Sequence, residues 1–343
     1  MRAAVFTGPG SIELQDIETP SAGPGEIVIK VEAATLCGTD LRIRSGAKSA
    51  GVVPGTVMGH EIAGRIEQIG EGVEGYEVGR QATVAIVVAC NHCPQCLDGR
   101  EHLCDHLRLF GYAINGGFAE YVLVPADVVA NGNVVQATKE LPPTHLALAE
   151  PLSCCLNAHA QYRVEPGDTV VILGAGPIGL LQLQLAKMSG ARNIVVTNRS
   201  AGRREVAERL GATHVVSPDD VAAAVAEATG GRGADAVVVC IGANELATTA
   251  LELARPGGRV NYFAGFSKGT SADVEVNLIH YKELTVTGGS NARRADVVRA
   301  VKVLESGVID GDAIVTHTFS LDDIADAYQA VEDKLGVKIA VTP

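Results

Sequence analysis

Three residue types that bind zinc lie near one another early in this sequence of 343 residues. Cys37 begins a Cys-Gly-Thr-Asp motif at 37–40, and His60 and Glu61 follow a glycine-rich turn at 51–55. A thiolate, an imidazole and a carboxylate together form a ligand set that suits zinc. By itself the His-Glu pair is explained more simply by a buried histidine beside a surface glutamate, so the remainder of the chain must decide.

Four cysteines form a second, denser cluster with the spacing C-x2-C-x2-C-x7-C: Cys90, Cys93, Cys96 and Cys104. Four thiolates within fifteen residues can close a tetrahedral site with no open position, which is the form of a structural zinc. Iron-sulfur proteins share part of this spacing, but they usually place the last cysteine closer and follow it with proline, whereas Asp105 follows here. Three nearby histidines are expected at the surface: His92, His102 and His106. The spacing therefore favours a structural zinc over an iron-sulfur cluster or free thiols.

A glycine-rich loop follows the strand-like run 170–173 and opens an apolar-periodic stretch typical of a helix: Gly174, Ala175, Gly176, Pro177, Ile178 and Gly179. This context is the one that the G-x-G-x-x-G dinucleotide motif requires. Gly174 permits the tight turn, Gly176 lets the backbone approach a pyrophosphate, and Gly179 allows close packing of helix and strand. Pro177 suits the first helical turn because its missing N–H would be unpaired there. The helix N-terminus favours a bound pyrophosphate over a glycine turn without a ligand.

The residues after the next strand bear on the choice of coenzyme. An acidic residue there would bind the ribose 2′-hydroxyl and repel a 2′-phosphate. This chain has Asn198, Arg199 and Ser200 instead, with Arg203 and Arg204 one turn further on. Loss of the carboxylate and gain of guanidinium groups favour NADP. In the alternative, the arginines are solvated and Asn198 holds a ribose hydroxyl of NAD.

Two different sequence patterns indicate the elements that must position these residues, one in each half of the chain. Up to about residue 150, short β-like runs alternate with glycine turns, which predicts a β-barrel-like domain: 26–31, 62–69, 81–89 and 118–124. From about residue 165, apolar strands alternate with helical stretches, which predicts parallel βαβ units: 169–173, 193–197, 214–216, 236–240 and 259–263. The tail is expected to return to the first domain with helices at 295–305 and 321–333 and strands at 314–319 and 338–341.

Bulk properties exclude several classes of function. The length allows two domains with separate cores, and the formal net charge of -12 disfavours nucleic acid or an anionic membrane surface as partner. No apolar run reaches the roughly 18 residues of a membrane span, and the N-terminus reads as a strand rather than a secretory signal. We therefore expect a cytoplasmic protein, in which cysteines serve metal binding, redox chemistry or burial more often than disulfides.

With these motifs in this order, the chain resembles the zinc-dependent medium-chain alcohol dehydrogenases over essentially its full length, and within them the polyol (sorbitol-like) and threonine dehydrogenases. Further matching motifs lie at 117–121 (Gly-Phe-Ala-Glu-Tyr) and 150–153 (Glu-Pro-Leu-Ser). The resemblance implies an α/β protein with a GroES-like β-barrel catalytic domain at 1–155 and a Rossmann doubly wound parallel sheet at 156–288. Residues 289–343 would return to the catalytic domain. A homodimer or homotetramer that acts on a small-molecule substrate is also implied.

The resemblance also implies roles for individual residues. One catalytic zinc would be held by Cys37, His60 and either Glu61 or Glu150, which could trade places on the metal during turnover. Thr39 would accept the alcohol proton and hand it onward, since a threonine hydroxyl is a poor base by itself. Zinc lowers the pKa of a bound alcohol, and the coenzyme takes the hydride.

Two departures from the family pattern concern the substrate. Many relatives have a histidine three residues after the threonine, where this chain has Arg42, which either holds a phosphate or carboxylate on the substrate or is solvated. Polyol dehydrogenases often have an arginine and an aromatic residue after Gly288, whereas 289–292 read Gly-Ser-Asn-Ala. The leading expectation is an NADP-dependent enzyme acting on a secondary alcohol or ketone of a polyol, sugar or amino alcohol. The alternatives are an NAD-dependent alcohol or threonine dehydrogenase, and a coenzyme-binding sensor without catalysis.

Overall fold

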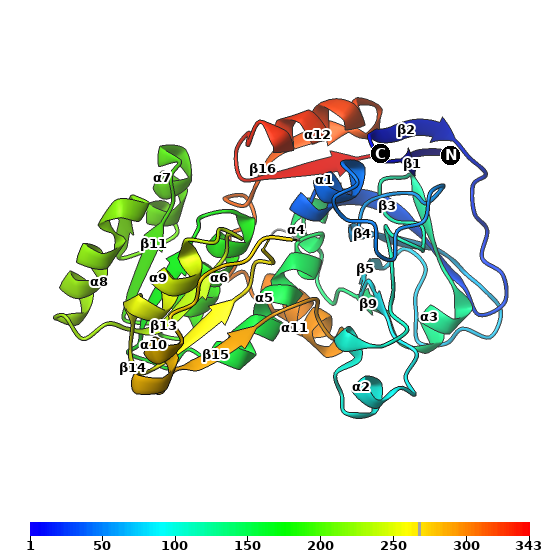
Figure 1. Ribbon diagram of the computed structural model, residues 1–343. Coiled ribbons are helices and arrows are strands. Elements are labelled where there is room, and N and C mark those ends of the chain that lie inside the picture. Colours follow the sequence, from blue (N-terminus) through cyan, green and yellow to red (C-terminus); the bar gives the residue numbers. More distant parts are fainter. Residues whose placement is uncertain (267–268) are drawn as a thin grey trace. The chain divides into compact units, whose positions relative to one another are not determined.

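The computed structural model describes residues 1–266 and 269–343 and divides the chain into two compact units (Figure 1). The first unit comprises Met1–Ser153, Asn291–Gly307 and Val315–Pro343. The second comprises Cys154–Ser290 and Val308–Ile314, so the first boundary falls inside helix α5 (Ala149–Tyr162). Within the described residues, no helix is long and apolar enough to cross a membrane.

A parallel sheet with the order β12-β11-β10-β13-β14-β15 forms the centre of the second unit. Its strands are β10 (Thr169–Leu173), β11 (Asn193–Thr197), β12 (His214–Val216), β13 (Ala234–Val239), β14 (Ala254–Tyr262) and β15 (Thr285–Gly288). The first three have the predicted bounds. β13 and β14 begin earlier than predicted, because Ala234 pairs with Ala254 ahead of a register shift. The strand order reverses between β10 and β13, which is where doubly wound sheets bind their ligands at the carboxyl ends of the strands.

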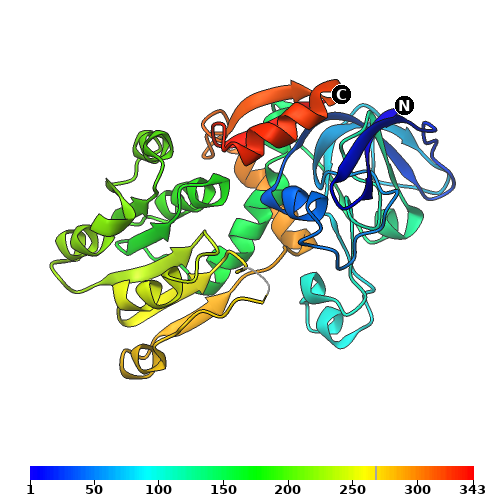
Figure 2. The ribbon, with the colours of Figure 1, turned by 45° about the horizontal axis from the view of Figure 1, so that its top comes forward.

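Helices cover both faces of this sheet (Figure 2). They are α6 (Pro177–Met188), α7 (Ala201–Arg209), the 3₁₀ turn η2 (Pro218–Asp220), α8 (Val221–Thr229), α9 (Leu246–Leu253) and α10 (Val276–Tyr281). Val171 and Leu173 of β10 share one apolar cluster with α8 and α9. Ile172 points to the opposite face, where it approaches Gly179 of α6. This two-sided burial explains why the strands read as continuous apolar runs rather than alternating ones.

The first unit contains a mostly antiparallel sheet with the order β16-β17-β3-β4-β5-β9, and β8 also pairs with β3. Its strands are β3 (Ile27–Thr35), β4 (Glu61–Ile69), β5 (Gln81–Val84), β8 (Tyr121–Val124), β9 (Val134–Gln136), β16 (Val315–Ser320) and β17 (Lys338–Thr342). Thr35 at the end of β3 lies opposite Glu61 at the start of β4 and opposite Ala340 of β17. The end of β3 therefore meets the start of β4 and the middle of β17 at one place.

Short elements complete the first unit. The strands are β1 (Arg2–Gly8), β2 (Ser11–Asp16), β6 (Val87–Val88) and β7 (Arg108–Leu109). The helices are α1 (Gly38–Arg44), α2 (Pro94–Leu97), α3 (Ala126–Ala130), α4 (Pro143–Leu146), α11 (Arg294–Glu305) and α12 (Ile324–Glu332), with 3₁₀ turns η1 (Glu101–Leu103) and η3 (Leu321–Asp323). The single strand predicted at 81–89 was wrong, because β5 pairs with β4 and β9 whereas β6 pairs with β7.

Candidate active site

The structure brings Cys37, His60 and Glu61 together in the first unit. One donor atom from each lies within 4.8 Å of the others. The pairing of β3 with β4 explains this convergence, since Cys37 follows β3 by two residues and His60 directly precedes β4. Sulfur, nitrogen and oxygen donors this close together fit a zinc ion with one open position.

The residue before His60 is a glycine, Gly59, whose backbone has a left-handed conformation. Gly59 has φ +88°, and a Cβ added there would lie 2.8 Å from the ring of Phe118. Phe118 is fully buried in the core, so it cannot yield to a larger residue. The turn thereby delivers His60, which is only 3% exposed, to the donor cluster.

Asp40 is a partner of this cluster that the sequence reasoning did not identify. It is fully buried, and its Oδ2 accepts a hydrogen bond from the Cys37 N–H at 2.8 Å. Its Oδ1 lies 3.3 Å from His60 Nδ1, an ion-pair contact whose geometry falls short of a hydrogen bond. Burial lowers the pKa of His60, but the Asp40 carboxylate and the Cys37 thiol together outweigh burial and raise the pKa above its usual value. With Nδ1 facing Asp40, Nε2 is left as the donor for a metal.

Lys338, from the start of β17, is a second unanticipated partner. Its Nζ lies 2.6 Å from Glu61 Oε2 and 2.9 Å from Oε1, and it also donates to the Leu36 carbonyl oxygen at 3.1 Å. The Thr35 hydroxyl donates to Glu61 Oε2 as well. Burial opposes the charge on Lys338, but the charges of Glu61 and Cys37 outweigh burial and raise its pKa. Glu61 is therefore held by a buried cation at the same time as it faces the other two donors.

Glu150 and Thr39 occupy different positions relative to these donors. Glu150 lies in the first turn of α5 and is not part of the donor cluster found among the described residues. Its charge nevertheless contributes to raising the pKa of Lys338. Thr39 lies in the first turn of α1, is partly exposed, and its Oγ1 accepts a hydrogen bond from Arg42 Nη2 at 3.1 Å.

The four cysteines of the lobe at 90–104 form the second donor cluster. Cys93 Sγ lies 3.5 Å from Cys96 Sγ and 3.9 Å from Cys104 Sγ, and the sulfurs of Cys90 and Cys96 are 4.0 Å apart. Tetrahedral zinc with bonds to sulfur of about 2.3 Å separates its thiolates by about 3.8 Å. A disulfide, with a bond near 2.05 Å, does not fit these separations. The geometry fits a closed four-thiolate zinc site.

Backbone groups and one arginine hold this lobe. The N–H groups of Cys90 and His106 donate to Cys104 Sγ, each at 3.3 Å. Arg294 at the start of α11 forms an ion pair with Glu101 at 3.0 Å. The expectation that all three nearby histidines lie at the surface was wrong for His102, which is 8% exposed, because η1 turns it inward.

The glycine loop of the second unit has the geometry that its motif predicts. Gly174 has φ +116°, and an added Cβ would lie 2.5 Å from Ile241. A Cβ on Gly179 would lie 1.7 Å from the Gly174 carbonyl oxygen, so the packing of α6 on β10 requires glycine there. At Gly176 an added Cβ would approach only Arg203 Nη1, at 3.9 Å, so this side of the backbone is open. Pro177 is the first residue of α6, and Ile178 beside it is partly exposed.

The residues after β11 divide into structural and accessible groups. Asn198 is buried and its Oδ1 accepts from the Ala175 N–H at 3.3 Å, which ties it to the glycine loop. Arg204 Nη1 donates to the carbonyl oxygens of Asn198 at 2.7 Å and Arg199 at 2.9 Å. Arg199 is exposed and lies 3.3 Å from Glu245, whereas burial lowers the pKa of Arg203 beside the loop. Arg204 therefore supports the turn, whereas Arg203 lies beside Gly176 and the Arg199 side chain is exposed.

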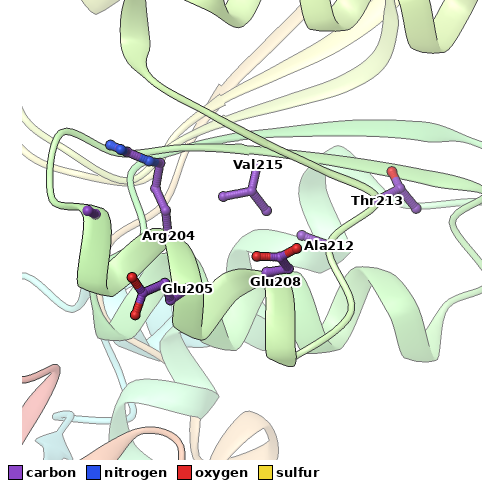
Figure 3. A pocket seen from close by; sticks show the side chains of 7 residues that line it. Arg204, Glu205, Glu208, Ala212, Thr213 and Val215 are labelled. Carbon is purple, nitrogen blue, oxygen red and sulfur yellow. The ribbon is translucent and has the colours of Figure 1, made fainter.

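A hollow of about 270 Å³ lies on the flank of the second unit (Figure 3). Residues of α7, of the segment leading into β12 and of β12 itself line it: Ala201, Arg204, Glu205, Glu208, Ala212, Thr213 and Val215. It contains neither a predicted metal ligand nor a glycine of the loop, and the carboxylates of Glu205 and Glu208 disfavour an anionic ligand. We assign it no role in the site.

Both parts of the chain match known protein families. The alcohol dehydrogenase GroES-like domain matches residues 23–134, and the zinc-binding dehydrogenase family matches residues 177–306. The L-threonine 3-dehydrogenase of Pyrococcus horikoshii is 36% identical over 337 residues, which cover 96% of this chain and 94% of that enzyme. A sorbitol dehydrogenase of Halalkalibacterium halodurans is 30% identical, with coverage of 100% and 99%.

A solved structure agrees with these relatives. A zinc-binding dehydrogenase from Sinorhizobium meliloti, bound to NADP, is 34% identical with a TM-score of 0.93, and the match covers 100% of this chain and 99% of the other. The sequence relatives and the architecture both correspond to zinc-dependent dehydrogenases. The chain belongs to the zinc-dependent medium-chain alcohol dehydrogenase family.

Proposed function

We propose that the protein transfers a hydride between NADP(H) and a secondary alcohol or the matching ketone, with a polyol, a sugar or a sugar-derived alcohol as substrate. The observation that carries the coenzyme assignment is the turn after β11, where Asn198 replaces a carboxylate and Arg199 and Arg203 flank it. Guanidinium groups bind a 2′-phosphate that a carboxylate would repel. The NADP bound to the Sinorhizobium meliloti protein and the sorbitol dehydrogenase relative support this proposal.

The donor clusters would hold two zinc ions per chain, one structural and one catalytic. When bound, zinc supplies Lewis acidity toward the substrate oxygen, and the nicotinamide coenzyme exchanges the hydride. Cys37 and His60, with Glu61 or Glu150 as the third ligand, would hold the catalytic ion. Asp40 orients the His60 ring, and Lys338 holds Glu61 ready at the edge of the cluster.

Thr39 would take the proton of the reacting hydroxyl. Its Oγ1 accepts from the Arg42 guanidinium at 3.1 Å, so the positive charge favours release of the hydroxyl proton of Thr39 away from Arg42. A threonine in this position receives one proton as it passes another outward, which avoids a free alkoxide on the side chain.

The coenzyme assignment is tested by kcat/KM for NADPH and NADH in the wild type and in Arg199→Asp. The substitution places a carboxylate where the ribose is expected. We expect the ratio of kcat/KM for NADPH to kcat/KM for NADH to fall by roughly tenfold or more, since a charged hydrogen bond to the 2′-phosphate becomes a repulsion. Arg209→Asp makes the same charge change at the far end of α7 and should leave the ratio nearly constant. A wild type that prefers NADH, with a ratio that Arg199→Asp does not alter, would refute the phosphate argument.

An NAD-dependent alcohol or threonine dehydrogenase is the second candidate. It is favoured by the contact of Arg199 with Glu245, which leaves less of that guanidinium for a phosphate, and by the L-threonine 3-dehydrogenase relative. Oxidation of L-threonine with NAD, at a higher kcat/KM than any polyol with NADP, would establish it.

A further inference from the structure

Two cations beside the predicted zinc ligands lack a carboxylate of their own. Arg42 lies on α1, and Lys48 lies in the following loop, where its N–H donates to the Arg42 carbonyl oxygen at 2.9 Å. In the part of the chain that the structure describes, neither side chain forms an ion pair, whereas Arg44 on the same helix pairs with Glu332. In a chain with 40 acidic and 28 basic side chains, two unmatched neighbouring cations call for an anion from outside the chain.

Contacts connect both cations to the donor cluster. Arg42 Nη2 donates to Thr39 Oγ1 at 3.1 Å, and Thr39 lies two residues after Cys37. Lys48 Nζ lies 5.3 Å from the centre of the Tyr112 ring, and that ring lies 5.7 Å from the ring of His60. The aromatic face holds the ammonium in place without neutralising it. Both positive charges therefore border the place where the reacting hydroxyl is expected.

The two side chains are able to receive an anion. Arg42 is exposed, and its contact with Thr39 uses one of five N–H donors, which leaves others for a carboxylate or phosphate. Lys48 is half-buried, and burial together with the charge of Arg42 lowers its pKa, although the Cys37 thiol opposes part of this shift. The cations repel each other as they stand, and a bound anion would relieve this repulsion.

We propose that Arg42 and Lys48 bind the carboxylate or phosphate group of an anionic hydroxy substrate, whose reacting hydroxyl is presented to Thr39 and the predicted zinc ligands. This inference rests on the proposed function and narrows its substrate class from neutral polyols to sugar acids, other hydroxy acids and sugar phosphates. Because Arg42 contacts both Thr39 and the substrate anion, binding of the anion also positions the residue that takes the proton.

The first test is a binding measurement that does not depend on turnover. Malonate and inorganic phosphate are titrated calorimetrically into zinc-loaded enzyme saturated with NADPH, so that the coenzyme phosphate sites are already filled. We expect Lys48→Met and Arg42→Met to raise the Kd of the better-bound anion by roughly tenfold or more, as loss of a charged partner implies. Arg44→Met, a matched loss of charge on α1, should leave it nearly constant. No binding by the wild type, or equal binding by all variants, overturns the inference.

The two anions also distinguish the source of the negative charge. Stronger binding of malonate assigns the site to a carboxylate, and stronger binding of phosphate assigns it to a phosphate ester. NADPH affinity is measured in the same variants. If it falls as much as the affinity for the anions, the cations serve the coenzyme and the substrate assignment is overturned.

Kinetics separate this inference from the proposed function. We compare D-sorbitol, D-gluconate and D-sorbitol 6-phosphate with NADP as coenzyme, and use the ratio of kcat/KM between charged and neutral substrates. Lys48→Met should lower this ratio, chiefly through KM. A wild type that oxidises D-sorbitol with no charge preference, and binds neither anion, rejects the inference and keeps the function. Anion binding that responds to both substitutions, without turnover of any alcohol, keeps the anion site and rejects the function.

Discussion

The two donor clusters of the first unit are built in different ways. The lobe at 90–104 uses four thiolates from one short segment, and backbone N–H groups supply many of their other contacts. The cluster of Cys37, His60 and Glu61 draws on the end of one strand and the start of another, and buried charged groups surround it.

The difference teaches which cluster can change its ligands. In the lobe, all four donors have the same chemistry, and among the described residues no buried cation pairs with them, which suits a closed site. In the other cluster, Lys338 binds both oxygens of Glu61, so a metal bound there would compete with the lysine for one carboxylate. Exchange of a ligand costs less where the released carboxylate already has a partner.

The largest effect is expected from Cys37→Ser. Loss of the thiolate should reduce the zinc content from two ions per chain to one and lower dehydrogenase activity on the order of a thousandfold, since Lewis-acid stabilisation is worth several kcal/mol. Metal analysis and steady-state rates measure both, with Cys154→Ser as a control outside the two clusters. One zinc in the native protein, with activity unaltered by Cys37→Ser, would remove the distinction between a catalytic and a structural cluster.

Lys338→Met tests the competition for Glu61. Both members of the ion pair are almost fully buried, so the uncompensated carboxylate should lower the free energy of unfolding by about 3 kcal/mol or more. The double variant Lys338→Met/Glu61→Gln should recover part of this loss in chemical denaturation, because it removes the orphaned charge. Zinc in the catalytic cluster should also leave more slowly to a chelator in Lys338→Met. Faster release would contradict the competition between lysine and metal.

A smaller effect is expected from Asp40→Asn, which keeps the shape of the side chain and removes its charge. The orientation of the His60 ring should weaken, and the affinity of the catalytic cluster for zinc should fall by roughly 10- to 100-fold. Competition with a chromophoric chelator resolves the two zinc sites. An equal loss from the cysteine lobe would show that Asp40 acts on the fold and not on His60.

The smallest effect is expected from Arg294→Met. Its partly buried ion pair with Glu101 anchors the lobe, so its loss should cost about 1 kcal/mol or somewhat more. Thiol-reagent kinetics should show faster modification of the lobe cysteines, while kcat with an alcohol substrate stays nearly constant. A large fall in kcat would mean that the lobe and the catalytic cluster are not independent.

Prediction from the sequence succeeded where the signal is local. The strands β10, β11 and β12 have their predicted bounds, because continuous apolar runs between turn residues indicate buried parallel strands. The prediction of one strand at 81–89 was wrong, since the division of this run into two strands depends on partners at 108–109 and 134–136. The prediction that His102 lies at the surface was wrong for a related reason, since the burial of a turn residue depends on what packs against the turn.

The composition of both donor clusters and of the glycine loop follows from the sequence by itself. The cysteines of the lobe and the glycines of the loop lie within a few residues of one another, whereas Cys37 is distant in sequence from His60 and was joined to it by the resemblance to a family. The charged partners were decided by the tertiary structure alone. Lys338 lies 277 residues from Glu61, and only the pairing of β17 with β3 brings it there. The contact of Asp40 with Cys37 is local, but its contact with His60 and that of Lys48 with the Tyr112 ring depend on the fold, because charge interactions act across space.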